Sequence, residues 1–124
     1  MNELEFGFET KAIRNQLDRT QFLEHSVPLY LTSSFVFEDA EDMRASFAEE
    51  KDRNIYSRYS NPNTNEFINK ICKMEGAESG FAFASGMAAV YSTLAALLQS
   101  GDHIVSAGSV FGATHSLFIN YFPK

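Results

Sequence analysis

The sequence has no tryptophan and a single cysteine, Cys72, which excludes an internal disulfide. It has no run of about 18 apolar residues, so it predicts no membrane-spanning helix. The first nine residues hold three glutamates and no basic residue, unlike a secretory signal. The net charge of −6 repels a phosphate backbone and argues against a nucleic-acid partner. Together these absences predict a cytoplasmic protein.

The remaining composition is that of a globular protein. Of its 124 residues, 44% are hydrophobic and 21% are charged, and one domain is the default expectation. The pattern changes near Asp52. Before it, short pieces predict a helix over Thr10–Leu17, extended chain over Val27–Thr32 and a helix capped by Asp39. Because this part lacks a long periodic pattern, we expect an arm that packs on something else.

The second part of the chain has a regular pattern that predicts a βαβ unit. A polar loop over Tyr56–Pro62 comes first. In the next helix, Asn63 and Glu66 have capping-box spacing, and Gly76 ends the helix. A strand, a helix and a second strand are then expected over Gly80–Ala84, Met87–Gln99 and Ile104–Ala107. This order implies a parallel strand pair with a right-handed crossover, and therefore an α/β fold.

The segment Ser85-Gly86-Met87-Ala88 stands where the first strand is expected to become a helix. The first amides of a helix have no internal partner and carry the positive end of its dipole. Gly86 has no β-carbon, so an anion can approach the backbone, and a phosphate is the natural ligand. The alternative is that Ser85 only caps the helix and Gly86 only makes the turn.

Two further features have the chemistry of a ligand site. Tyr56 and Arg58 alternate in a polar loop, where a phenol and a guanidinium can donate side by side to an oxyanion, unless the loop is simply exposed. Phe111 follows the second expected strand, where its ring can stack on a flat ligand or belong to the core. The histidines match no ligand spacing, so we expect no metal site. Cys72 is expected to be a buried small apolar residue.

Taken together in order, these residues resemble the cystathionine γ-synthase and methionine γ-lyase family of pyridoxal-phosphate (PLP) enzymes of cysteine and methionine metabolism. The resemblance runs from about Thr10 to the end of the chain. Its most specific parts are Tyr56–Asn63 and Ala84–Ala89. The resemblance implies an N-terminal arm, residues 1–52, and the first part of a type I PLP-enzyme large domain, residues 53–124. That domain is similar to the one in aspartate aminotransferase.

The resemblance also implies roles for the site residues. Gly86 and Met87, next to Ser85, would give backbone amides to the cofactor phosphate. Tyr56 and Arg58 would reach the phosphate site of a neighbouring subunit, within a homotetramer built from dimers. The arm would pack against that neighbour. Phe111 stands where many family members have a tyrosine stacked on the cofactor ring, and it lacks that residue's hydroxyl.

The loop Phe111-Gly112-Ala113-Thr114-His115 is similar to the branch that uses O-succinylhomoserine or O-acetylhomoserine. Such sulfhydrylases replace the acyl group with sulfide and form homocysteine for methionine biosynthesis. The alternatives within the family are cystathionine γ-synthesis, which is a trans-sulfuration step, and methionine γ-elimination. An alternative of another class is a non-catalytic fragment that only binds a full-length subunit.

The family's Schiff-base lysine is expected downstream of this chain, in a segment rich in serine and threonine. The lysines present match no such context; they are Lys11, Lys51, Lys70, Lys73 and Lys124. We therefore expect no catalytic residue here, and no activity from these 124 residues alone. Two strands without neighbours would also expose apolar edges, so we expect the isolated chain to be insoluble or partly folded.

Overall fold

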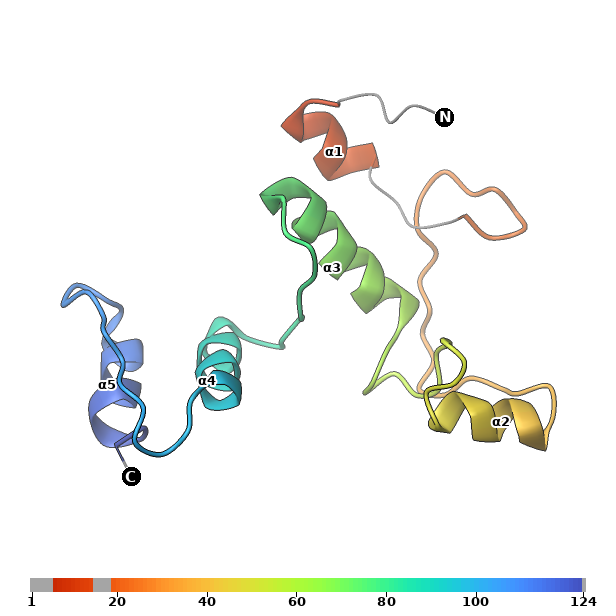
Figure 1. Ribbon diagram of the computed structural model, residues 1–124. Helices are drawn as coiled ribbons and strands as arrows, with labels where there is room; N and C mark the ends of the chain where they lie inside the picture. The colour runs from red at the N-terminus through yellow and green to blue at the C-terminus, as the bar shows by residue number, and fades with distance from the viewer. Residues whose placement is uncertain (1–5, 15–18, 124) are drawn as a thin grey trace. The chain divides into compact units, whose positions relative to one another are not determined.

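The computed structural model describes residues 6–14 and 19–123. Within these ranges the regular structure is helical and no strand forms, although an isolated antiparallel bridge pairs Ser34 with Tyr56. The helices, shown in Figure 1, are α1 Phe8–Arg14, α2 Ala40–Phe47, α3 Pro62–Glu75, α4 Gly86–Leu97 and α5 Gly112–Asn120. The chain divides into two compact units, of which the first ends at Phe81 and the second begins at Ala82.

Helix α1 packs against α3 within the first unit. It confirms the helix predicted from Thr10, although it begins earlier, at Phe8. Residues 15–17 of that prediction lie outside the described residues. At the end of α1, Nη1 of Arg14 lies 2.6 Å from Nε2 of His25. A neutral imidazole nitrogen accepts a hydrogen bond from a guanidinium, so this contact ties α1 to the chain that follows it.

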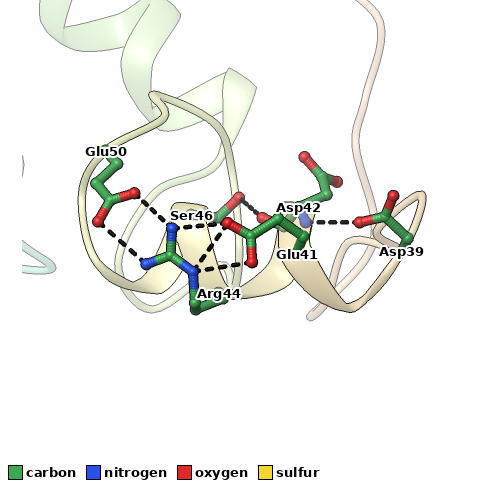
Figure 2. Close-up of polar contacts among 6 residues, drawn as sticks. All are labelled: Asp39, Glu41, Asp42, Arg44, Ser46 and Glu50. Atoms are coloured by element: carbon green, nitrogen blue, oxygen red, sulfur yellow. Dashed lines mark hydrogen bonds and ion pairs between the residues drawn. The ribbon is translucent and has the colours of Figure 1, made fainter.

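Helix α2 begins where the sequence predicts. Asp39 is extended, and its carboxylate accepts a 2.7 Å hydrogen bond from the amide of Asp42, which satisfies one orphan donor of the first turn. Figure 2 shows Arg44 held between two glutamates, with Nη2 donating to Glu41 at 2.7 Å and to Glu50 at 2.6 Å. All three side chains are more than half exposed, so these ion pairs stabilise the helix only slightly.

Asp42 joins α2 to the chain on both sides of it. Its carboxylate is buried and accepts from Lys51 Nζ at 2.6 Å, from the amide of Glu38 at 3.1 Å, and from Arg53. Arg53 also donates to the carbonyl of Val36 at 2.8 Å. The hydrogen bond from Lys51, followed by that from the Glu38 amide, lowers the pKa of Asp42 from 3.8 to about 2.

The start of α3 corrects the prediction of a capping box between Asn63 and Glu66. The N-cap is Asn61, whose side chain accepts a 2.9 Å hydrogen bond from the amide of Asn63, and Pro62 is the first helical residue. Proline suits that position because its fixed φ is helical and no amide is needed there. Gly76 ends the helix as predicted, in the left-handed conformation with φ of 67°.

The predicted strands Gly80–Ala84 and Ile104–Ala107 are not formed, although the helix between them is present as α4. Neither segment makes a backbone ladder hydrogen bond among the described residues. A strand of a parallel sheet needs neighbours to satisfy its amides and carbonyls, and none pairs with either segment here. The described part of the chain therefore does not build the α/β sheet that its sequence predicts.

Most of the large apolar side chains remain in contact with solvent. Cys72 is buried as predicted, and among the described residues it is the one buried hydrophobic residue. A β-carbon on Gly80 would lie 3.1 Å from its sulfur, so the chain after α3 packs closely there. By contrast Leu31, Phe81 and Val105 are 91%, 89% and 99% exposed. Apolar surface of this extent favours contact with another protein surface.

We expect the isolated chain to aggregate or to remain partly folded, because it buries too little apolar surface to offset its conformational entropy. Urea unfolding followed by circular dichroism should be broad, and a dye specific for exposed apolar surface should bind before any urea is added. A sharp two-state transition of a soluble monomer at micromolar concentration would contradict this expectation.

Acid should release the Asp42 contacts before the helices melt. A carboxylate whose folded pKa is depressed contributes stability above its unfolded pKa of 3.8 and loses that contribution as the pH falls through about 2. The measurement is amide exchange at Glu38, whose N–H donates to Asp42. Protection should fall between about pH 4 and pH 2.

The substitution Asp42→Asn should remove that pH dependence and lower the protection at neutral pH. Asp52→Asn, an exposed carboxylate nearby with the same charge change, is the matched control and should leave the Glu38 amide unaffected. Equal exchange profiles for the two variants would show that Asp42 does not hold this region.

Candidate functional site

The loop before α3 places Tyr56, Arg58 and Tyr59 in one cluster. The guanidinium carbon of Arg58 lies 6.0 Å from the centroid of the Tyr56 ring and 4.4 Å from that of Tyr59. Its Nη2 donates a 2.9 Å hydrogen bond to the Tyr59 hydroxyl. All three residues are exposed, so the remaining guanidinium donors are open to an oxyanion, which arginine binds bidentately.

Backbone hydrogen bonds hold this loop against a segment twenty or more residues earlier in the chain. The antiparallel bridge pairs Tyr56 with Ser34, and the amide of Phe35 donates to the carbonyl of Ile55 at 3.2 Å. The amide of Ser57 donates to the carbonyl of Ser33 at 2.8 Å. These bonds fix the backbone on both sides of Tyr56. The backbone positions from which the Tyr56 ring and the neighbouring guanidinium extend are therefore defined.

Tyr59 is a member of this cluster that the sequence did not predict. It is adjacent to Arg58 in the sequence, and that aromatic neighbour is the signal that could have indicated it. Tyr59 also lines a cavity of about 560 Å³ that Lys51 and Arg53 border. Both cations are already paired with Asp42, so the cavity offers less positive charge than its lining suggests.

The start of α4 brings Ser85, Gly86 and Met87 together in the second unit. Ser85 is the N-cap, and its hydroxyl accepts a 3.2 Å hydrogen bond from the amide of Ala88. The amides of Gly86 and Met87 have no partner among the described residues. A β-carbon added to Gly86 would meet nothing within 4 Å, so the approach to these amides is open. The geometry at the start of α4 is compatible with helix capping and with anion binding.

Phe111 immediately precedes α5 and is 72% exposed. It makes no ring contact or side-chain cap among the described residues, and its carbonyl accepts from the amide of His115 at 3.0 Å. The exposed ring is therefore not a core residue of the described chain. Within the same unit, Tyr91 of α4 stacks on Phe122 with ring centroids 5.7 Å apart, which helps α4 and α5 pack.

Other kinds of site find no support in the part of the chain that the structure describes. No group of three or more histidine, cysteine, aspartate or glutamate side chains lies there in an arrangement able to hold a metal ion. Among the same residues, none of the helices is both long enough and apolar enough to cross a membrane. The 56–60 loop and the start of α4 carry groups that can donate hydrogen bonds to an anion.

Two substitutions separate the capping and the anion-binding function of the α4 start. Ser85→Ala removes the cap and should destabilise α4 by about 1 kcal/mol, measured by amide exchange within the helix. Gly86→Ala should leave α4 as stable as before, because the position is open and not left-handed, yet it should weaken binding of inorganic phosphate several-fold. Unchanged phosphate binding in Gly86→Ala would indicate that these amides do not face an anion.

Comparison with known proteins gives an independent assignment. Residues 9–124 match the family model described as Cys/Met metabolism PLP-dependent enzyme. Among individual relatives, the O-succinylhomoserine sulfhydrylase of Pseudomonas aeruginosa is 46% identical over 118 residues, which are 95% of this chain and 29% of that protein. The L-methionine gamma-lyase of Fusobacterium nucleatum is 39% identical over 111 residues, or 90% of this chain and 28% of that protein.

A solved structure supports the same relationship. It is the crystal structure of a Campylobacter jejuni protein assigned as an O-acetylhomoserine (thiol)-lyase, with a TM-score of 0.86 and 32% identity over 94% of this chain and 28% of that one. It carries N'-pyridoxyl-lysine-5'-monophosphate at its position 205. This chain thus spans less than a third of the length of these relatives. It belongs to the Cys/Met metabolism PLP-dependent enzyme family and corresponds to the N-terminal part of its members.

Proposed function

We propose that this chain is the N-terminal part of a cytoplasmic, PLP-dependent sulfhydrylase that converts an acylated homoserine and sulfide to homocysteine. The observation that supports the proposal is the presence of two sets of groups that can donate to a phosphate. These are the open amides at the start of α4 and the Tyr56–Arg58 pair. The relatives named as sulfhydrylases give the reaction class.

The described residues fit the phosphate group of PLP. The amides of Gly86 and Met87 would donate to its oxygens, where the helix dipole favours negative charge and no side chain blocks the approach. Arg58 and Tyr56 would add charge-assisted donors, from the neighbouring subunit if the shared site of the family applies. When bound, PLP withdraws electrons from the amino-acid substrate and so makes its α- and β-protons removable.

The described residues would bind and orient, and would transfer no proton themselves. Phe111 offers a flat, exposed ring that can stack on the cofactor ring, and it has no hydroxyl that could carry a proton. The lysine that forms the Schiff base would lie beyond residue 124, since the related structure carries its modified lysine at position 205. Catalysis would therefore need the longer protein, and this chain alone would be inactive.

The proposed division of the chain is the one that the family resemblance implies. Residues 1–52 would form the arm that covers a neighbouring subunit, and residues 53–124 would begin the PLP-binding domain of a dimer-built tetramer. The high exposure of Leu31 and Leu29, at 91% and 78%, supports an arm whose apolar side chains are covered by another surface.

Methionine γ-lyase is the second candidate, because a relative with that activity is 39% identical over most of this chain. The full-length protein that contains this chain should be assayed with each acylated homoserine in the presence of sulfide, of cysteine, or of no nucleophile. We expect homocysteine with sulfide at a kcat/KM at least about tenfold above either alternative. Faster cystathionine formation with cysteine would indicate a γ-synthase, and faster release of ammonia without nucleophile would indicate a γ-lyase.

The substitution Phe111→Tyr tests the role of the ring. If Phe111 only stacks, the tyrosine ring replaces it and the added hydroxyl should change kcat for sulfhydrylation less than about threefold. Phe111→Leu removes the flat surface and should lower the affinity for PLP. A large gain in activity on adding the hydroxyl would show that a proton-transfer group is missing from the native site.

A further inference from the structure

We propose that Asn61 and Asn63 are positioning residues for the cofactor phosphate. Their side-chain amides clamp the segment Pro28–Tyr30 to the loop that presents Tyr56 and Arg58. This inference rests on the proposed function, because it assigns to two further residues the task of holding the phosphate-binding side chains in place. Neither asparagine needs to touch the phosphate for this purpose.

The side chain of Asn63 binds the backbone of Pro28 and Tyr30 in the way that a neighbouring β-strand would. Its Oδ1 accepts from the amide of Tyr30 at 2.8 Å, and its Nδ2 donates to the carbonyl of Pro28 at 2.7 Å. In an extended chain the carbonyl of one residue and the amide of the second residue after it lie on the same edge. One side-chain amide satisfies both groups, and an ionised carboxylate cannot replace it because it has no donor.

Asn61 connects the loop, the segment and the helix. Asn61 is buried, and its Oδ1 caps α3 by accepting a 2.9 Å hydrogen bond from the amide of Asn63. Its Nδ2 donates to the carbonyl of Tyr30 at 3.2 Å and to the hydroxyl of Ser57 at 3.0 Å. A buried amide with its oxygen and both donors used in this way holds its partners in a single arrangement.

Ser57 transmits the clamp to the phosphate donors because it stands between Tyr56 and Arg58. Its hydroxyl donates to the carbonyl of Thr32 and accepts from Asn61, while its amide donates to Ser33 at 2.8 Å. Ser57 is therefore held through its backbone and its side chain, while its neighbours Tyr56 and Arg58 are exposed. Loss of the Asn61 donor would remove one side-chain contact of Ser57 and leave the tripeptide held more loosely, by its backbone hydrogen bonds and the Ser57 hydroxyl.

The decisive variant is Asn61→Asp, measured in the full-length protein. A carboxylate keeps the acceptor that caps α3, yet it has no donor for Tyr30 or Ser57. Asn65→Asp is the matched control, since it makes the same change of charge at an exposed position in the first turns of α3. Ser57→Ala removes the hydrogen bond between Asn61 and Ser57 by deleting its acceptor. It is the variant to measure if Asn61→Asp fails to fold.

Equilibrium binding of PLP should weaken about tenfold in Asn61→Asp and in Ser57→Ala, because hydrogen bonds that fix the donor loop are lost. Binding of inorganic phosphate should weaken in parallel. The KM for the amino-acid substrate at saturating PLP should match that of Asn65→Asp, although the loss of buried hydrogen bonds lowers the thermal stability of Asn61→Asp. A general structural role would raise this KM as well.

Two outcomes would overturn the inference, and they are distinguishable. If Arg58→Ala weakens PLP binding while Asn61→Asp and Ser57→Ala bind it as tightly as Asn65→Asp, the proposed function stands and the clamp has no positioning role. If Arg58→Ala also binds PLP normally, this loop does not face the cofactor, and the proposed phosphate site falls together with the clamp.

Discussion

The described residues leave most of their large apolar side chains exposed, and the rest of the structure depends on that constraint. Among the described residues Cys72 is the buried hydrophobic, whereas Val105 and Phe81 are almost fully exposed. Order is therefore local, and it comes from caps, helical hydrogen bonds and polar contacts such as those around Asp42. Such contacts fix short pieces of chain, while a sheet and a core require surfaces that these residues do not supply.

Features that depend on neighbouring residues could be predicted from the sequence. Asp39 and Ser85 cap their helices and Gly76 ends α3, because each acts on amides or carbonyls within one turn. The capping box at Asn63 was wrong because Pro62 fits the first helical position and moves the cap to Asn61. The prediction of two strands was wrong because strand formation depends on distant partners and not on neighbouring residues. The apolar pattern of the strands is present, but the strands that would pair with them lie far along the chain or outside it.

The candidate site divides in the same way. The spacing of Tyr56 and Arg58 and the small residues at the start of α4 are visible in the sequence, and their chemistry indicates an oxyanion. The contacts around the 56–60 loop are not visible there, since Asn63 and Asn61 reach Pro28 and Tyr30 across more than thirty residues. Pattern reasoning finds groups able to bind a ligand, whereas the groups that position them emerge only from the fold.

The central claim is that this chain contributes the phosphate-binding end of a PLP site whose lysine lies elsewhere in the protein. The most direct measurement is a crystal structure of the full-length protein with PLP bound. The account predicts phosphate oxygens within hydrogen-bond distance of the Gly86 and Met87 amides and of the Arg58 guanidinium, and a cofactor-linked lysine beyond residue 124. A phosphate held by other residues, with these amides facing solvent or protein, would contradict it.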